Sequence, residues 1–393
     1  MRNIILLMLG SFLLSAVVAQ KKNPVVLPPA VSNVGPAKFF TGVKWRNIGP
    51  YRGGRSVAAT GVVNNPFTYY MGTVGGGVWK TEDAGISWQN MSDGQLKTSS
   101  VGAIAVAASD ANIIYVGMGE HAVRGVMSSY GDGVYKSMDA GKTWMYLGLA
   151  LTRQIAAIRI DPKNPDNVLV AAQGASYGAT SERGIYKTSD GGMSWKKTLY
   201  VDEHTGCADL SMDMNNPRIL YAAMWDHQRL PWQVRSGGKG SGLYKSIDGG
   251  DSWTRLEKGL PKELGKMAIA VSGANSNKVY ADIESDTEKE QGGVFVSNDA
   301  GMSWSRVSKD HNTVHRAWYY IEIAADPLNE EVVYVMSSPM LKSIDGGKTF
   351  NRMTTMHGDH HNMWINPINS KNIILADDGG AVVTFNGGET WSS

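Results

Sequence analysis

Cysteine is almost absent from this sequence, with Cys207 as the one example among 393 residues. A chain with a single cysteine forms no intramolecular disulfide and offers no cysteine-based zinc site. A thiol near a histidine, here His204, suggests a nucleophile, but nothing in the sequence indicates a third group that would orient such a pair. We therefore expect Cys207 to be a small, half-buried strand residue.

An excess of charge of either sign is also missing. Lys and Arg number 38 and Asp and Glu 36, so the formal net charge is +2. A protein that binds nucleic acid through a basic surface carries a clear positive excess. The balance therefore argues against nucleic acid as a partner.

Long apolar runs are missing apart from one at the N-terminus. Ile4–Val18 is almost wholly apolar, follows the basic start Met1–Asn3, and is followed by small residues up to Ala19. This order is typical of a cleaved secretory signal, and the run is short for a membrane span. The sequence predicts a signal peptide over residues 1–19 and a linker over 20–41. We expect a secreted or periplasmic protein with no membrane span after cleavage.

Glycine and tryptophan, in contrast, are plentiful, at 46 and 12 residues. Many of them belong to one repeated phrase, GVYKSMDAGKTW in its Gly133–Trp144 copy. The further copies are Gly77–Trp88, Gly184–Trp195, Gly242–Trp253 and Gly293–Trp304, with looser ones at Leu341–Phe350 and Val382–Trp391. Each copy has the pattern of a hairpin, follows two alternating strands, and recurs after roughly 40–60 residues. The sequence therefore predicts an all-β propeller of seven four-stranded blades over residues 42–393.

An acidic residue stands at the turn of six of the repeated hairpins. The six are Asp83, Asp139, Asp190, Asp248, Asp299 and Asp345, and Asn386 takes their place in the seventh copy. We expect each to accept hydrogen bonds from its own turn and the following tryptophan to pack between blades. One carboxylate per turn is a poor ligand set for calcium, which takes six to eight oxygens. We expect a structural role, with no metal and no other cofactor.

The repeated phrase resembles the Asp-box, or bacterial neuraminidase repeat. Such repeats occur in sialidases, sortilin-type receptors, xyloglucanase-type glycoside hydrolases and photosystem assembly factors. Other stretches are similar to a family of secreted bacterial sortilin-like propeller proteins that are often labelled glycosyl hydrolases: Trp45–Arg55, Leu199–Gly206, Leu220–Trp225, Arg316–Tyr320 and His357–Pro367. The resemblance implies the propeller fold. Members of that family are typically longer, which suggests either a fragment or a propeller closed by a strand at Val43–Ile48.

A sialidase proper is disfavoured by the start of the propeller. The sialidase family has a Phe-Arg-Ile-Pro stretch there, which supplies one arginine of a carboxylate-binding triad. In this sequence the corresponding region reads GPYRGGR, so Arg52 and Arg55 are present but the motif is not matched.

The topology of a propeller predicts where a site would lie. If the strands of a blade are A to D from the channel outwards, the A–B turns and C–D hairpins share one face. The longer D–A and B–C loops share the other, where loops on a rigid scaffold carry function. Candidate ligand-binding residues on that face are Arg52, Arg55, His121, Arg124, Trp225, His227, Trp232, Arg316, Trp318, His357 and His360.

Glycoside hydrolysis would need two carboxylates on either side of the scissile bond. The candidate catalytic residues are Glu120, Asp226 and Asp378, each expected to follow a B strand, and the sequence does not choose between them. Their alternative role is hydrogen bonding within loops. A metal set of His357, Asp359 and His361 is less favoured than a polar loop, because no distal ligand is identifiable.

Two functions remain. The first is a sortilin-like propeller that binds a peptide, protein or glycan, and the alternative is a glycoside hydrolase of the xyloglucanase type. A pair of carboxylates beside an open groove with exposed tryptophans would favour the hydrolase.

Overall fold

The computed structural model describes residues 42, 54–125, 128–285 and 291–392. The chain divides into two units, residues 1–48 and 49–393, and the second unit holds the whole described fold. The predicted signal peptide and linker, Arg52 and the expected closing strand Val43–Ile48 lie outside the described residues. Across the part of the chain that is described, no helix is long and apolar enough to cross a bilayer.

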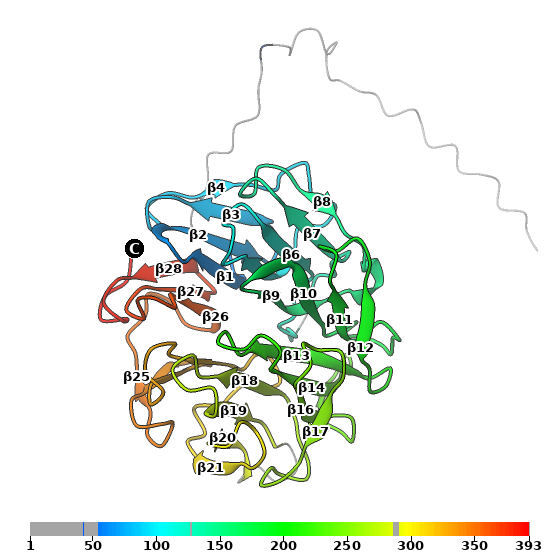
Figure 1. The fold of residues 1–393 in the computed structure, drawn as a ribbon, viewed down its shortest axis with the longest axis vertical. Helices are drawn as coiled ribbons and strands as arrows, with labels where there is room; N and C mark the ends of the chain where they lie inside the picture. Colours follow the sequence, from blue (N-terminus) through cyan, green and yellow to red (C-terminus); the bar gives the residue numbers. More distant parts are fainter. Residues whose placement is uncertain (1–41, 43–53, 126–127, 286–290, 393) are drawn as a thin grey trace, which may run out of the picture. The chain divides into compact units, whose positions relative to one another are not determined.

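Seven antiparallel sheets make up the second unit (Figure 1). Blades 1 to 3 are β1 (Ser56–Val62), β2 (Asn65–Thr73), β3 (Val78–Thr81), β4 (Gln89–Asn90); β5 (Val101–Val106), β6 (Ile114–Met118), β7 (Val134–Ser137), β8 (Met145–Tyr146); and β9 (Ile155–Asp161), β10 (Asn164–Ala172), β11 (Gly184–Thr188), β12 (Lys196–Leu199). Blades 4 and 5 are β13 (Thr205–Met212), β14 (Leu220–Arg229), β16 (Gly242–Ser246), β17 (Thr254–Leu256); and β18 (Met267–Val271), β19 (Val279–Ile283), β20 (Gly293–Ser297), β21 (Ser305–Ser308). Blades 6 and 7 are β22 (Glu322–Ala325), β23 (Val333–Met336), β24 (Met340–Ser343), β25 (Asn351–Arg352); and β26 (His360–Ile365), β27 (Ile373–Asp377), β28 (Gly380–Thr384). A short β15 (Val234–Ser236) extends β14, and one 3-10 turn, η2 (Ala150–Thr152), follows blade 2.

The blades close into a ring through their first strands. β1 contacts β5, and the contacts continue through β9, β13, β18 and β22 to β26, which contacts β1. Within each blade the strands pair in sequence order, apart from the β15 extension. The all-β propeller of seven blades is therefore confirmed. In blade 7 the Ser392 amide donates to the Val383 carbonyl at 2.7 Å, which begins the pairing expected of a fourth strand.

The repeated hairpins share one hydrogen-bond scheme. In blade 2, Asp139 Oδ1 accepts from the Ser137 hydroxyl and the Thr143 amide, both at 2.8 Å, and Oδ2 accepts from the Thr143 hydroxyl at 2.6 Å. These donors lower the pKa of Asp139 to about 2. In blade 7 Asn386 accepts through Oδ1 and donates through Nδ2 to Thr390, so an amide replaces the carboxylate without loss of the turn. Both oxygens of Asp139 are thus occupied within the hairpin.

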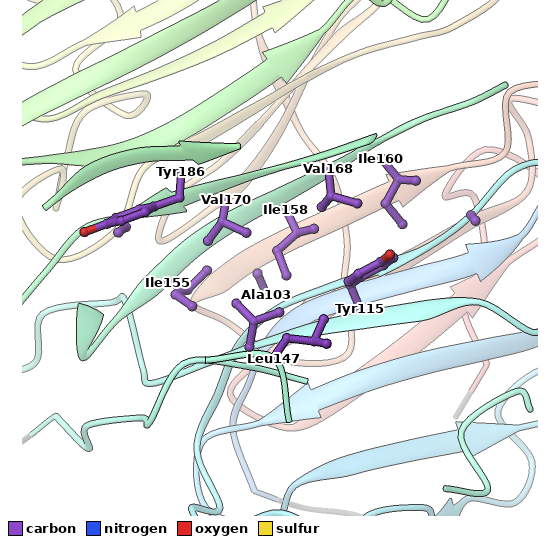
Figure 2. Packing of buried hydrophobic residues seen from close by; sticks show 12 residues of the cluster. Ala103, Tyr115, Leu147, Ile155, Ile158, Ile160, Val168, Val170 and Tyr186 are labelled. Carbon is purple, nitrogen blue, oxygen red and sulfur yellow. The ribbon is translucent and has the colours of Figure 1, made fainter. Parts of the chain in front are cut away.

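Tryptophans of the hairpins join neighbouring blades, as the sequence predicts. The indole N–H of Trp144 donates to the Met91 carbonyl of blade 1, and that of Trp195 donates to the Leu147 carbonyl of blade 2, at 2.8 and 2.9 Å. Apolar side chains fill the space between blades, as in the cluster that joins Val134 and Leu147 of blade 2 to the residues of β9 and β10 (Figure 2). The core therefore lies between successive sheets.

A channel cavity of about 520 Å³ runs between the first strands of the blades. Much of its wall is made of small side chains, among them Ala58, Ala103, Ala156, Ala270 and Ala324. In β26 the first two residues are buried and the next four are half-buried, and β5 and β22 show the same gradient. The cavity is therefore closed where the first strands begin and open where the A–B turns lie. Asn215, Pro327 and Pro367 line this open end.

Candidate functional site

The end of the channel where the first strands begin is sealed by polar and aromatic side chains. All of the following are at most 9% exposed: Arg55, His121, Lys266, Tyr319, Tyr320, Glu322 and His361. They come from the D–A and B–C loops or the first residues of A strands, on the face where the sequence places its candidate site.

A cluster of charges surrounds Arg55 at the outer side of this seal. The guanidinium of Arg55 forms an ion pair with Glu120 and donates to the hydroxyl of Tyr319. Its Nε lies 3.9 Å from Asp378 Oδ1. Arg124 lies close enough to influence the pKa values of Arg55, Tyr319 and Asp378. One guanidinium therefore joins a carboxylate from blade 2 to one from blade 7.

A second carboxylate of blade 7 belongs to the same cluster. Asp359 Oδ2 accepts from Arg316 Nη1 at 2.9 Å, and its Oδ1 accepts from the Tyr320 hydroxyl at 2.8 Å. Asp359 has a φ of 55°, in the left-handed region that aspartate tolerates better than most residues. We call Arg55, Glu120, Arg124, Arg316, Tyr319, Asp359 and Asp378 the mouth cluster.

Two carboxyl groups of blade 7, Asp377 and Asp378, have raised pKa values. Partial burial, and less strongly the negative charge of Asp359, raise the pKa of Asp378, while Arg55 lowers it in part. Burial raises the pKa of the neighbouring Asp377 to about 6. The side chain of Asp378 is 34% exposed, so this acid remains in contact with solvent. A partly exposed acid with a raised pKa is suited to proton donation.

Glu120 is less suited to meet a substrate. It is 1% exposed, and its carboxylate faces Arg55 and the interior. Both Glu120 and Asp378 contact the guanidinium of Arg55. Access to Glu120 requires Arg55 to move. Its position favours a role in fixing Arg55.

Some buried charges of the seal also form the floor of the channel cavity, which Glu322 lines. Burial raises the pKa of Glu322 well above its usual value, and the negative charge of Asp209 adds to the effect. Burial lowers the pKa of Lys266 to about 8, although Glu322 and other carboxylates attract its charge. His121 Nε2 lies 3.8 Å from Glu322 Oε1, and burial lowers the pKa of His121 to about 3. These groups couple the mouth cluster to the cavity.

Three predicted ligand-binding or catalytic residues of blade 4 do not belong to the mouth cluster. Trp225 and His227 are fully buried and stack on each other with ring centres 4.0 Å apart. Asp226 forms an ion pair with Arg235 at 2.9 Å, and it lies within β14 instead of following it as expected. The buried guanidinium of Arg183 contacts His227 at 3.2 Å. Trp225 and His227 therefore anchor a loop and present no face for ligand stacking.

The remaining predicted residues differ widely in exposure. Trp232 is 76% exposed, Trp318 is half-buried, and His357 is exposed. His360 is buried and contacts the Thr355 hydroxyl and the Ser337 carbonyl. These positions leave Trp232 as the one fully presented aromatic among the candidates.

The three residues of the metal set considered from the sequence are each bound to other partners. Asp359 binds Arg316, and His361 Nδ1 contacts the Ser56 carbonyl at 2.9 Å. Asp359 precedes β26, so the strand alternation assumed for His357, Asp359 and His361 does not apply. Within the described ranges no group of three or more His, Cys, Asp or Glu side chains is arranged to hold a metal ion.

The sequence reading missed the channel floor. Asp209, Lys266 and Glu322 are charged residues at or beside the first strand of a blade, where neighbours are small or apolar. A charged residue within such an apolar strand pattern is the sequence feature that could have indicated the channel floor. Cys207 is fully buried, not half-buried, and burial raises its pKa, which removes it as a nucleophile.

Comparisons with known proteins support this fold. No protein-family model matches the sequence. A xyloglucanase from Paenibacillus sp is 20% identical over 367 residues, which cover 84% of this chain and 34% of that enzyme. The crystal structure of the GH74 xyloglucanase from Xanthomonas campestris has a TM-score of 0.64 and 17% identity, over 88% of this chain and 54% of the other. A structure of YCF48 bound to D1 peptide has a TM-score of 0.56 and 12% identity, over 85% of this chain and 94% of that chain.

These likenesses differ in how much of each protein they include. The chain spans about a third of the Paenibacillus relative and about half of the Xanthomonas structure, but nearly all of the YCF48 chain. At such identities the structural likeness establishes the fold alone. The chain is thus a seven-bladed propeller similar in fold to part of the xyloglucanases and to YCF48.

Proposed function

We propose that this chain is a glycan-acting propeller of the glycoside hydrolase type, whose substrate is a β-glucan of the xyloglucan class. The observation that carries the proposal is the sequence match to a xyloglucanase over 84% of the chain. It favours the hydrolase over the sortilin-like binder, because this match is to a named enzyme. As for xyloglucanases secreted to reach a polysaccharide, we expect action outside the cytoplasm.

The mouth cluster supplies the groups that such a reaction needs. Asp378, with its raised pKa and partial exposure, takes the part of the general acid that protonates the leaving oxygen. Asp359 takes the part of the second carboxylate, and Arg316 and Tyr320 hold it in place. Two carboxyl groups in different environments are the arrangement that divides acid and base roles.

Arg55 and Glu120 position these groups. The Arg55 guanidinium contacts Asp378 and Tyr319, and the buried Glu120 carboxylate balances its charge. A positive charge beside Asp378 limits the rise of its pKa, so the acid remains able to release its proton.

Turnover of a glycan panel tests the proposal. The chain is incubated with xyloglucan and other β-glucans, and new reducing ends are measured for the wild type, Asp378→Asn and Asp359→Asn. Removal of the acid lowers kcat by roughly 10²–10⁴-fold. Asp93→Asn, at an exposed residue of blade 1, serves as the matched control and leaves kcat unchanged.

Two results would count against the proposal. Turnover that persists in both Asp378→Asn and Asp359→Asn would move the active site away from the mouth cluster. Absence of turnover on every glycan, with the wild type folded, would remove the hydrolase assignment.

Peptide binding is the second candidate function. It is supported by the match to almost the whole YCF48 chain, whose structure contains a D1 peptide. Retention of peptides on an array by the wild type, together with no turnover of glycans, is the result that would favour it.

A further inference from the structure

The channel cavity is a second place where a ligand fits, on the face opposite the mouth cluster. Its volume of about 520 Å³ lies within the roughly 300–1,000 Å³ range of small-molecule sites. The cavity is blind, because buried side chains close it at the mouth-cluster end and half-buried strand residues open it at the other. A blind cavity of this size is suited to the end of a chain molecule.

The floor of the cavity carries a carboxylate that lacks a hydrogen-bond donor. Glu322 lines the cavity and is 8% exposed, and among the described residues its contact is His121 at 3.8 Å, beyond hydrogen-bond distance. Asp209, also in the lining, accepts from the amides of Leu210 and Ile269 at 2.7 and 2.8 Å. A buried carboxylate without a donor is costly unless a ligand or water supplies one.

The floor has as many acidic as basic side chains, which suits a neutral ligand. The carboxylates Asp209 and Glu322 are accompanied by two cations, Arg159 in the lining and Lys266 beside it. Arg159 Nη2 lies 3.8 Å from Asp209 Oδ1. A cationic ligand would meet both positive groups, whereas a neutral ligand with several hydroxyl groups would donate to Glu322 at no charge cost.

An aromatic side chain and an amide complete the lining. Trp364 lies against β1, where a Cβ on Gly61 would approach its ring to 2.3 Å, so the absence of a side chain there permits the ring's position. Tyr69 contacts the same ring edge-on at 6.2 Å. Asn362 lies two residues before Trp364, and its Oδ1 accepts from the Ala59 amide at 3.1 Å. A fixed indole beside polar groups is suited to the apolar face of a sugar ring.

We infer that the channel is a second carbohydrate site that accepts the end of a neutral oligosaccharide, with Glu322 as hydrogen-bond acceptor and Trp364 as stacking surface. The inference rests on the proposed function in one respect, which is that the chain meets glycans. The site itself is separate from the mouth cluster, and it performs no bond cleavage. The channel site would hold one end of a glycan while another part of the same glycan lies at a different surface of the protein.

Isothermal titration calorimetry of the full chain with cellotriose tests this site. We expect a binding event that Trp364→Leu weakens by about tenfold, as for the loss of one aromatic contact. Glu322→Gln, which keeps the size of the side chain, weakens it less. Ala324→Phe, which fills the channel wall, abolishes the heat of binding. Asp93→Asn is the control and leaves the cellotriose affinity unchanged, because Asp93 is exposed in blade 1 and does not line the cavity.

Circular dichroism and the melting temperature establish which variants are folded. Absence of binding to the wild type, or unchanged affinity in folded Trp364→Leu and Glu322→Gln proteins, would overturn the inference. Binding of short peptides that Ala324→Phe blocks, with no binding of cellotriose, would overturn it as well.

The outcomes separate this site from the proposed function. Cellotriose binding that responds to Trp364→Leu in a protein without glycan turnover would leave the channel site standing and remove the hydrolase. Turnover that Asp378→Asn abolishes, without cellotriose binding in the channel, would do the reverse.

Discussion

A buried carboxyl group in blade 5 makes the stability of this propeller depend on pH near neutrality. Asp282 lies in β19 and is fully buried. Burial raises its pKa from 3.8 to about 7, and the nearby Thr313 hydroxyl and Ile283 amide offset only part of this rise. Neither carboxylate oxygen has a hydrogen bond of ordinary geometry among the described residues. The perturbation to make is Asp282→Asn, which removes the titration and nearly preserves the shape.

The sign of the effect follows from the two pKa values. The folded state holds the proton up to about pH 7, whereas the unfolded chain releases it near pH 3.8. The contribution of Asp282 to stability is therefore fully present below pH 3.8 and is lost as the pH rises to about 7. About three pKa units at 1.36 kcal/mol each give a loss of about 4 kcal/mol. Asp282→Asn removes this loss.

Urea unfolding at pH 5 and pH 8 measures the effect. At pH 8 we expect the variant to be more stable than the wild type by up to about 4 kcal/mol, and at pH 5 the advantage is smaller by roughly 2–3 kcal/mol. Asp377, with a pKa of about 6, adds a slope of the same sign to both proteins, so the difference between them isolates Asp282. Asp93→Asn controls for the removal of a carboxylate. An equal loss of stability at both pH values in Asp282→Asn would refute the reasoning.

Three further predictions concern the framework. Asp139→Ala lowers the melting temperature by a few degrees without changing ligand affinity, whereas Asp139→Asn has a smaller effect, since blade 7 uses an amide in the same turn. Differential scanning fluorimetry of both variants distinguishes these outcomes. Lost affinity at unchanged stability would contradict a structural role. Cys207 is unreactive toward a thiol reagent in the folded protein and reacts fully in urea, and rapid labelling of the native chain would contradict its complete burial. Gly206→Ala prevents soluble expression or lowers stability by more than a typical core substitution, because its Cβ would lie 1.9 Å from the Gln173 carbonyl oxygen. If urea unfolding gave this variant the same stability as the wild type, the close backbone approach would be relaxed in solution.

The fold was accessible from the sequence because one local pattern recurs in every blade. The hairpin at Asp139 contains its own hydrogen-bond donors, its turn glycine and its tryptophan within a dozen residues. The structure of each copy can therefore be predicted from its local sequence alone. The order of the strands within a blade follows from short connections. Local patterns of this kind are readable from one sequence.

The site was less accessible because its residues meet only through ring closure. Arg55 and Asp378 are far apart in sequence, and the contact between β1 and β26 is what brings them together. Trp225 illustrates the converse, since nothing in its local sequence distinguishes a buried anchor stacked on His227 from an exposed platform. Charged residues of the channel floor, such as Glu322, each occur in a single blade. They do not belong to the repeated pattern, so the repeat does not predict them.

The indole bonds between blades all point in one direction along the chain. Trp144, Trp195, Trp253 and Trp391 each donate to an acceptor in the blade that precedes their own in sequence. During translation an emerging blade therefore carries the donor, and the blade already released from the ribosome carries the acceptor. The acceptor for each new hairpin is therefore already synthesised, and this order is suited to stepwise assembly from the N-terminal side. Only the final junction, between the last blade and the first, depends on the whole chain being present.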